Sequence, residues 1–286
     1  MGFFSWLFKR NKPKTIKLGL ALGSGGAKGF AELGALKAFE ENQIEFDVVA
    51  GTSIGSVIGA FYANGYSSTD MLELLQSLDF SQVTNLFMIQ MDTLGLFRVI
   101  DKTIGSLDIS ELKKPFMAVA TELETGKEAV FNKGNVAMAL CASSSYPPFF
   151  KPVVIDDKRY VDGAFTNSLP ADLVKNMGAD YIVGIDLSNH QPKPSLLQKF
   201  IPTFESKVEK PWAKGYEFSN VVIHPNLSAY KATSFKNMHE IYEIGYLSAI
   251  EMMPKVNAFL QQRTSDSVTM EGTIGQLVEM MEGVDI

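Results

Sequence analysis

Residues 47–55 read D-V-V-A-G-T-S-I-G, in which a short apolar strand passes directly into an apolar helix. The segment Gly51–Gly55 has the pattern G-x-S-x-G, which predicts a serine nucleophile in a strand–turn–helix context. Gly51 and Gly55 leave room for neighbouring backbone at a tight turn, so the hydroxyl of Ser53 is expected to be exposed. The following helix directs its N-terminus, with partial positive charge, towards the site. We therefore predict that Ser53 is a nucleophile; a glycine-rich turn with a capping serine is the alternative.

A glycine-rich loop, Gly23–Gly29, has the sequence G-S-G-G-A-K-G and lies between a predicted strand and a predicted helix. It is not a P-loop, because Lys28 is followed by glycine rather than by serine or threonine. It fits a dinucleotide-binding fingerprint poorly, because Ser24 replaces the first glycine of G-x-G-x-x-G. The nearest acidic residue at the right distance, Asp47, also lies at the start of the second strand, away from the position of a ribose. A dinucleotide-binding loop remains a disfavoured alternative.

The same loop is suited to stabilising a negatively charged oxygen. Gly25 and Gly26 lack side chains, so their N–H groups can face a tetrahedral intermediate at the N-terminus of a helix. Each donor in such an oxyanion hole contributes roughly 3–4 kcal/mol of transition-state stabilisation. Lys28 either adds positive charge nearby or is a solvated helix residue. We predict that Gly25 and Gly26 form an oxyanion hole.

A serine nucleophile requires a general base, and Asp162 is the candidate. It begins the sequence D-G-A after a predicted strand, far downstream of Ser53. A carboxylate with an ordinary pKa near 4 is a weak base, but partial burial raises that pKa. Gly163 would let the chain turn closely past the serine. On these residues alone, an Asp-Gly turn without a catalytic role is the alternative.

Three histidines, His190, His224 and His239, all follow Asp162 in the chain. The order Ser, Asp, His also fits the catalytic triad of an α/β-hydrolase, which is a further alternative. The histidines lie too far apart in sequence to suggest a local metal motif, and a single cysteine excludes a disulfide framework. That cysteine, Cys141, lies in an apolar run and is expected to be a core thiol. We therefore expect no metal and no cofactor.

Charge is distributed unevenly along the 286 residues, whose formal net charge is −6. Residues 1–31 contain six basic residues and no acidic residue, so the rest of the chain is strongly acidic. An acidic body argues against broad nucleic-acid binding, because contact with phosphates requires a basic surface. The composition, 46% hydrophobic and 20% charged, is that of an ordinary globular protein.

The N-terminal segment, residues 1–14, combines aromatic and basic residues. It begins M-G-F-F-S-W-L-F, and four basic residues follow within the next six positions. Aromatic side chains beside a basic cluster suit the interface between membrane and water, with the bases facing anionic head groups. A secretory signal has its charges before the apolar stretch, which is the reverse order. We expect a cytoplasmic protein whose N-terminal segment contacts the inner membrane face; a frayed terminus is the alternative.

The pattern of apolar residues predicts strands that alternate with helices. Strands are expected at residues 15–22, 46–52, 116–121, 128–131, 153–155, 159–161, 181–187 and 220–223. Helices are expected at residues 27–41, 54–64, from Ser68 onward with Ser68 as the N-cap, and at 136–143, 170–177 and 237–262. Such alternation predicts an α/β fold with a mostly parallel sheet and helices on both faces. Ligands in these folds bind at the carboxyl ends of the strands, where both glycine-containing loops fall.

These elements are expected to form one domain, residues 15–262. Within it, residues 190–218 are polar and lack a clear period, so they are expected to be an insertion or a lid. Pro254 is expected to interrupt the last helix. Residues 263–286 carry apolar residues at helical spacing and are expected to form a helical C-terminal tail.

Four motifs, taken together and in order, resemble those of the bacterial patatin-like phospholipases. They read G-S-G-G-A-K-G, G-T-S-I-G, A-S-S-S-Y-P-P-F-F-K-P-V and D-G-A, and the resemblance extends from about Lys17 to Gly245. The resemblance implies a three-layer α/β/α sandwich, here with a C-terminal helical extension. It also implies a Ser–Asp dyad that works without histidine.

By position, the resemblance implies Ser53 as the nucleophile and Asp162 as the base. Gly25 and Gly26 are implied as the oxyanion donors, and Ser24 stands where the family loop usually begins with glycine. The implied reaction is hydrolysis of a fatty acyl ester of a phospholipid or lysophospholipid, through an acyl-enzyme and without a metal. The alternatives from other classes are a catalytically silent, membrane-associated regulatory or scaffold protein and a dinucleotide-dependent oxidoreductase.

Overall fold

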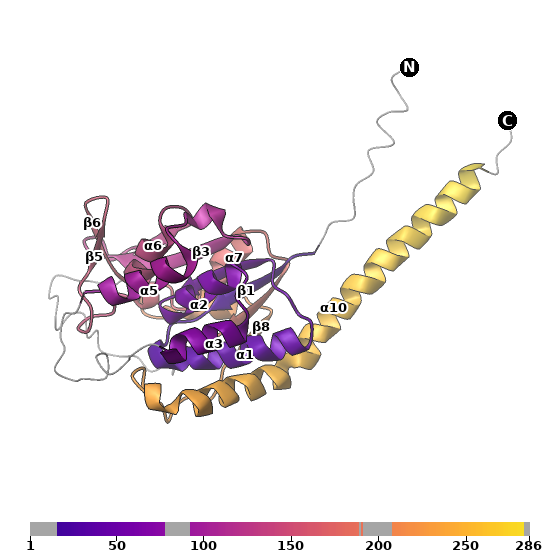
Figure 1. Ribbon diagram of the computed structural model, residues 1–286. Coiled ribbons are helices and arrows are strands. Elements are labelled where there is room, and N and C mark those ends of the chain that lie inside the picture. Colours follow the sequence, from indigo (N-terminus) through magenta and orange to yellow (C-terminus); the bar gives the residue numbers. More distant parts are fainter. Residues whose placement is uncertain (1–15, 78–91, 189, 191–207, 283–286) are drawn as a thin grey trace, which may run out of the picture. The chain divides into compact units, whose positions relative to one another are not determined.

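The computed structural model describes residues 16–77, 92–188, 190 and 208–282, with side chains described up to residue 261 (Figure 1). The N-terminal segment that is expected to contact membranes therefore lies outside the described residues. No helix in the described ranges is long and apolar enough to span a membrane.

Residues 17–252 form one compact unit, which is built on a mixed β-sheet. The described residues contribute eight strands in the order β5-β6-β3-β2-β1-β7-β8, with β4 also paired to β3. Their bounds are β1 Leu18–Leu22, β2 Val48–Thr52, β3 Phe116–Glu122, β4 Glu128–Phe131, β5 Val153–Ile155, β6 Lys158–Asp162, β7 Tyr181–Ile185 and β8 Val221–Ile223. Strands β8, β7, β1, β2 and β3 run parallel, and the pairs that involve β4, β5 and β6 are antiparallel. Every predicted strand is present, with ends shifted by a few residues.

Eight helices accompany this sheet in the described residues. Their bounds are α1 Phe30–Glu41, α2 Ile54–Ala63, α3 Ser68–Ser77, α5 Leu94–Ile104, α6 Val136–Ser143, α7 Ala171–Asn176, α9 Ala213–Phe218 and α10 Met238–Glu282. Short 3-10 turns lie at η1 Gly26–Gly29, η2 Ile109–Glu111, η3 Gly163–Phe165 and η4 Phe235–Asn237. Helices α5 and α9 are not among the helices expected from the sequence, and the other six are.

Helices cover both faces of the sheet. Helix α2 packs on β1, β2 and β3, and α7 packs on β1, β2 and β7. Gly59 of α2 lies against Val49, whereas Val174 of α7 packs in a cluster with Val48. Consecutive residues of a strand point to opposite faces, so α2 and α7 lie on opposite sides. The prediction of a three-layer α/β/α sandwich is confirmed.

Helices α1 and α10 cross at two glycines. A Cβ on Gly34 of α1 would overlap the carbonyl oxygen of Tyr242, and a Cβ on Gly245 would overlap the carbonyl oxygen of Ala31. Glycine at both positions therefore allows the two backbones to touch. This contact attaches the first part of α10 to the layer of helices formed by α1, α2 and α3, which contact one another.

The expectation that Pro254 interrupts the last helix is wrong. Helix α10 continues through Pro254 to Glu282, so the predicted tail is a continuation of the same helix. A proline removes one backbone hydrogen bond and can kink a long helix without ending it. The part of this helix from Met253 onward belongs to a second unit.

One further local prediction needs correction. Ser67 rather than Ser68 caps α3, because its hydroxyl accepts the N–H of Asp70 at 3.1 Å and its own N–H donates to that carboxylate at 2.9 Å. Ser68 is buried and donates instead to Glu40. In the expected insertion, residues 213–218 form helix α9, while residues 191–207 lie outside the described part of the chain.

Candidate active site

Ser53 occupies a strained turn between β2 and α2. Its φ of 56° and ψ of −125° lie in a region that residues other than glycine rarely adopt. A Cβ on Gly51 would overlap the carbonyl group of Gly55, and a Cβ on Gly55 would lie 2.6 Å from the carbonyl oxygen of Gly23. Both glycines are therefore required by close packing of the backbone, and that packing holds the serine in its unusual conformation.

Asp162, the last residue of β6, lies next to this serine. The hydroxyl of Ser53 donates a hydrogen bond of 2.6 Å to Oδ2 of Asp162. The other carboxylate oxygen, Oδ1, accepts the N–H of Ala164 at 2.8 Å. The structure thus brings together the predicted nucleophile and the predicted base, with the carboxylate held at both oxygens.

The sheet explains why these two residues meet. Strands β2 and β6 lie along the same edge of β3, because β4 pairs with the opposite edge over residues 118–121. Thr52, the last residue of β2, pairs with Val119. Asp162 pairs with the next residue of β3, Ala120. The carboxyl ends of β2 and β6 therefore meet head to head at neighbouring positions.

The environment of Asp162 changes its acidity. The side chain is fully buried, and this burial raises its pKa from 3.8 to about 7, although hydrogen bonds from Ser53 and Ala164 lower it in part. A carboxyl with a pKa near neutrality can accept a proton and return it at physiological pH. The required change in pKa comes chiefly from desolvation of the charged form.

Ser143, at the end of α6, holds the backbone of the serine turn and was not singled out from the sequence. Its hydroxyl accepts the N–H of Ser53 at 2.9 Å and donates to the carbonyl oxygen of Val119. Three consecutive serines stand at residues 143–145, and the sequence contains no signal that distinguishes them. Gly163 also packs on β3, because a Cβ there would overlap the same carbonyl oxygen of Val119.

Both ends of the glycine-rich loop lie against the serine turn. Gly23 contacts Gly55, and a Cβ on Gly29 would overlap the side chain of Ile54. The N–H groups of Gly25 and Gly26 donate no hydrogen bond to an acceptor in the described part of the chain. The loop therefore presents free backbone N–H donors beside the serine turn, as an oxyanion hole requires.

Lys28 is not a solvated helix residue. Its side chain is buried, and Nζ donates to the carbonyl oxygen of Leu187 at 3.4 Å. Its ammonium group thus connects the glycine-rich loop to the segment that follows β7.

The histidines and the cysteine lie apart from the serine and the aspartate. His190 and His224 contact Asp186, and the exposed His239 lies near the start of α10. No imidazole among the described residues is hydrogen-bonded to the serine or its carboxylate partner. Cys141 is buried, and burial raises the pKa of its thiol to about 11, which leaves it protonated.

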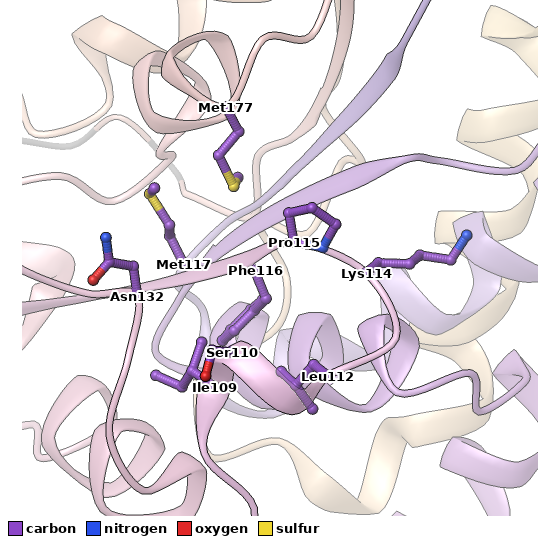
Figure 2. Close-up of a pocket in the computed structure, with 9 residues that line it drawn as sticks. All are labelled: Ile109, Ser110, Leu112, Lys114, Pro115, Phe116, Met117, Asn132 and Met177. Carbon is purple, nitrogen blue, oxygen red and sulfur yellow. The ribbon is translucent and has the colours of Figure 1, made fainter.

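A pocket of about 380 Å³ lies at the other end of β3, around its first residues (Figure 2). Pro115, Phe116, Met117 and Met177 are among the residues that line it (Figure 2). Ser53 directly follows β2 and Asp162 ends β6, and both lie near Val119 and Ala120 of β3, so this pocket at the first residues of β3 is not the candidate site.

A family model described as patatin-like phospholipase matches residues 20–175. The neuropathy target esterase sws of Drosophila melanogaster is 28% identical over 277 residues, which cover 80% of this chain and 19% of that protein. Human patatin-like phospholipase domain-containing protein 6 is 29% identical, with 80% of this chain and 20% of that protein covered. An uncharacterised NTE family protein of Mycobacterium tuberculosis is 29% identical, with 63% and 51% covered. The chain thus spans between a fifth and a half of the length of these relatives.

Among solved structures, the crystal structure of VipD from Legionella pneumophila is similar, with a TM-score of 0.58 and 13% sequence identity. The match covers 84% of this chain and 67% of that one, and it bears on the fold alone. A second family model, for the T3SS EscN ATPase C-terminal domain, matches only residues 248–279 of α10.

Proposed function

This chain belongs to the patatin-like phospholipase family, whose model covers more than half of it, and on that premise we propose that it is a serine acyl hydrolase. Its substrates are fatty acyl esters of phospholipids or lysophospholipids. The observation that carries the proposal is the 2.6 Å hydrogen bond from Ser53, on a strained turn, to the buried carboxylate of Asp162. We assign the acyl hydrolase domain to residues 15–262.

In the first half of the reaction, Oγ of Ser53 attacks the ester carbonyl carbon while Asp162 accepts the hydroxyl proton. The existing hydrogen bond already points that proton at the carboxylate. The tetrahedral intermediate then collapses, the bond from carbon to the leaving oxygen breaks, and Asp162 returns the proton to the departing alcohol. An acyl-enzyme on Ser53 remains.

In the second half, water attacks the acyl-enzyme. Asp162 accepts a proton from that water, and the acyl carbon bonds to the new oxygen. Collapse of the second intermediate returns the proton to Oγ of Ser53 and releases the fatty acid. A carboxyl whose pKa is about 7 suits both directions of transfer, because it is a stronger base than an ordinary aspartate and remains an acid near neutrality.

We assign the stabilisation of the negatively charged intermediates to the N–H groups of Gly25 and Gly26. Support comes from the absence of an acceptor for either group in the described residues and from the packing of both loop ends on the serine turn. Lys28 anchors the loop and brings a positive charge into the short helix η1 that ends it.

The test is hydrolysis of a short p-nitrophenyl ester and of a lysophospholipid. We expect Ser53→Ala and Asp162→Asn each to reduce kcat/KM by at least about 10³-fold, as removal of a nucleophile or its base does in other serine hydrolases. The matched control is Ser144→Ala. It removes the buried hydroxyl of the residue after Ser143, and that hydroxyl has no hydrogen-bond partner in the described residues. Trapping a radiolabelled acyl group on the wild type, but not on Ser53→Ala, would identify the acyl-enzyme.

The same assays separate the alternatives. A triad requires one of the single variants His190→Ala, His224→Ala or His239→Ala to lose as much activity as Ser53→Ala, with its circular dichroism spectrum unchanged. A silent scaffold protein requires no turnover by wild type on either ester. An oxidoreductase requires saturable binding of NAD(P), which calorimetry would detect.

We propose in addition that the N-terminal segment, residues 1–14, attaches this cytoplasmic protein to anionic membrane surfaces. The proposal rests on its aromatic and basic sequence. Deletion of residues 1–12 should reduce co-sedimentation with vesicles that contain phosphatidylserine, and raised salt should reduce binding of the full chain. Equal binding by the deletion variant would refute the proposal, and vesicles of phosphatidylcholine alone provide the comparison.

A further inference from the structure

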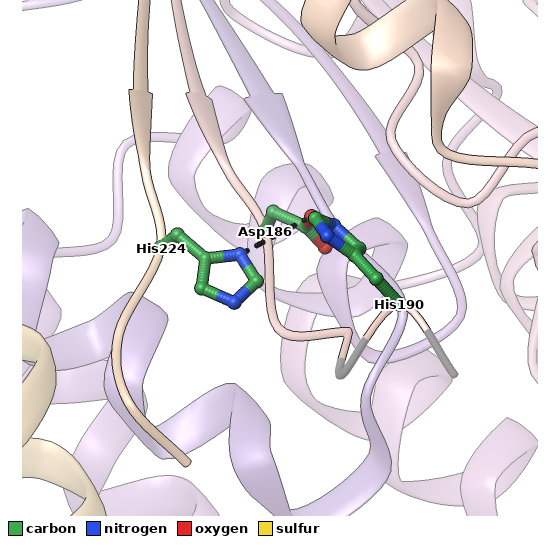
Figure 3. A group of neighbouring side chains, drawn as sticks. All are labelled: Asp186, His190 and His224. Atoms are coloured by element: carbon green, nitrogen blue, oxygen red, sulfur yellow. Dashed lines mark hydrogen bonds and ion pairs between the residues drawn. The ribbon is translucent and has the colours of Figure 1, made fainter. Parts of the chain in front are cut away.

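A second group of chemically active side chains lies beyond the carboxyl ends of β7 and β8 (Figure 3). Asp186 follows β7, His190 lies four residues later, and His224 follows β8. Nε2 of His190 lies 2.6 Å from Oδ2 of Asp186, and Nδ1 of His224 lies 3.4 Å from the same oxygen. Folding thus brings together two histidines that are too far apart in sequence to predict a metal motif.

The surroundings of these three side chains hold them in place. Asp186 is buried, and its second oxygen, Oδ1, accepts the N–H of Ser188 at 2.9 Å. The ring of His190 stacks on Trp212 with 5.1 Å between centroids and 16° between planes. The hydroxyl of Tyr216 donates to Oδ2 of Asp186 at 3.0 Å. Both oxygens of the carboxylate are therefore oriented, and one imidazole is fixed by an aromatic neighbour.

Three polar side chains converge on a single oxygen atom. Oδ2 of Asp186 faces nitrogen atoms of both histidines and the hydroxyl of Tyr216, which also lies 3.1 Å from Nδ1 of His224. A carboxylate oxygen offers about two lone-pair directions, so one oxygen cannot pair with all three neighbouring groups in good geometry. A cation at the centre of the group would accept lone pairs from both imidazole nitrogens and from the carboxylate oxygen.

The spacing of the three ligand atoms suits a small cation. The carboxylate oxygen and the two imidazole nitrogens all lie within 4.8 Å of one another. Around a tetrahedral zinc ion, with bonds of about 2.1 Å, neighbouring ligand atoms are about 3.4 Å apart. Nδ1 of His224 already has this separation from the carboxylate, and Nε2 of His190 needs to move outward by less than about 1 Å.

Charge and access also fit a cation. Asp186 is buried and accepts the N–H of Ser188 and the hydroxyl of Tyr216, and its carboxylate oxygen is a ligand type that divalent zinc accepts. The side chains of His190 and His224 are 35% and 39% exposed, so the group is open to solvent on the imidazole side.

We propose that Asp186, His190 and His224 form a binding site for a divalent transition-metal ion. Two imidazoles and one carboxylate favour zinc and its neighbours in the first transition series over calcium and magnesium, which prefer oxygen ligands. The three protein ligands leave at least one coordination position for water. This site is separate from Ser53, because β1 lies between β7 and β2.

The site adjoins the glycine-rich loop through the backbone. Gly23 donates its N–H to the carbonyl oxygen of Ile185 at 3.1 Å, and Lys28 donates to the carbonyl oxygen of Leu187 at 3.4 Å. These acceptors are the residues immediately before and after Asp186. A bound ion therefore fixes the segment on which both ends of the loop depend, and we expect it to stabilise the folded chain.

The test measures metal directly, on the full chain purified without a polyhistidine tag. After treatment with a chelator and dialysis, wild type is titrated with Zn²⁺ by calorimetry, and retained zinc is measured by mass spectrometry. We expect one Zn²⁺ per chain, a higher Tm with Zn²⁺ and no comparable effect of Ca²⁺. His190→Ala and His224→Ala should each weaken binding by at least tenfold, whereas His239→Ala, which removes the third histidine, should bind as wild type does.

A second pair of variants separates loss of metal binding from loss of the folded structure. His224→Gln and His190→Gln keep a side chain that can donate a hydrogen bond to Asp186 but lack an imidazole ligand. If the glutamine variants are folded by circular dichroism and lose Zn²⁺ binding, the site is supported. Absence of Zn²⁺ binding by wild type, or binding by the alanine and glutamine variants equal to that of wild type, would overturn it and leave only a hydrogen-bonded cluster.

Discussion

Ser53 and Asp162 are 109 residues apart in the chain, and their side chains are joined by a hydrogen bond of 2.6 Å. The contact exists because the ends of β2 and β6 meet at neighbouring positions along one edge of β3. Each partner is constrained separately, the serine by its turn and Ser143, and the aspartate by Ala164. A dyad held in this way has little freedom to lose on reaching the transition state, which favours reaction.

Activity should depend on pH through Asp162, whose pKa is raised to about 7 by burial. Only the ionised carboxylate can accept the serine proton, so kcat/KM should fall about tenfold per pH unit below 7 and level off above it. The measurement is a pH–rate profile with a fluorogenic ester, accompanied by circular dichroism at each pH to exclude unfolding. A profile that stays flat down to pH 5 would mean that the base has the pKa of an ordinary carboxyl group.

The same carboxyl should make stability depend on pH in the opposite direction from an ordinary ion-paired aspartate. The pKa of Asp162 is higher in the folded chain than its ordinary value of 3.8, so the folded state binds more protons between about pH 4 and 7. Its favourable contribution is fully present below about pH 4 and is lost as pH rises to 7. The loss is at most about 4 kcal/mol, at 1.36 kcal/mol per pKa unit.

Asp162→Asn tests this linkage, because asparagine cannot ionise. Urea unfolding of wild type and variant at pH 5 and pH 8 should show the variant gaining stability relative to wild type at the higher pH. A constant difference between the two proteins across this range would show that the folded and unfolded states share one pKa at this position.

Ser143→Ala should lower both the free energy of unfolding and the rate of ester hydrolysis. The variant leaves the N–H of Ser53 and the carbonyl oxygen of Val119 without the hydroxyl that joins them. An unsatisfied buried group costs about 1–3 kcal/mol, and a serine turn that is less firmly held should lower kcat more than it raises KM. Urea unfolding and steady-state kinetics measure the two effects.

Ser144→Ala is the matched control for that experiment. The hydroxyl oxygen of Ser144 is buried and has no hydrogen-bond partner within the described residues. Its removal should leave stability and kcat near those of wild type or raise stability slightly. Equal effects of the two substitutions would contradict a specific role for Ser143.

Much of the fold could be predicted because its signals are local. The strand, the glycine-containing turn and the helix around Ser53 are contiguous in the chain. The sequence alone therefore indicates both the serine turn and its place at the end of a strand. Ser143 could not be selected, because which of three adjacent serines reaches the turn depends on the packing of α6 on β3. The approach of His190 and His224 to the same carboxylate could likewise not be predicted, because it requires β7 and β8 to be neighbours. Such contacts depend on strand order, which the period of apolar residues does not encode.

Gly163→Ala should be among the more damaging single-methyl additions in this chain. The added Cβ would overlap the carbonyl oxygen of Val119, which belongs to a central strand and cannot move aside. Overpacking of this kind costs about 1–3 kcal/mol, and relief of the clash would displace Asp162, which immediately precedes the glycine. We therefore expect a lower free energy of unfolding together with a fall in kcat.

The control is Gly95→Ala in α5, where no described atom lies within 4 Å of the added Cβ and where alanine favours a helix by up to about 1 kcal/mol. If Gly163→Ala retained the stability and turnover of Gly95→Ala, close contact between β3 and the end of β6 would not be what positions the carboxylate.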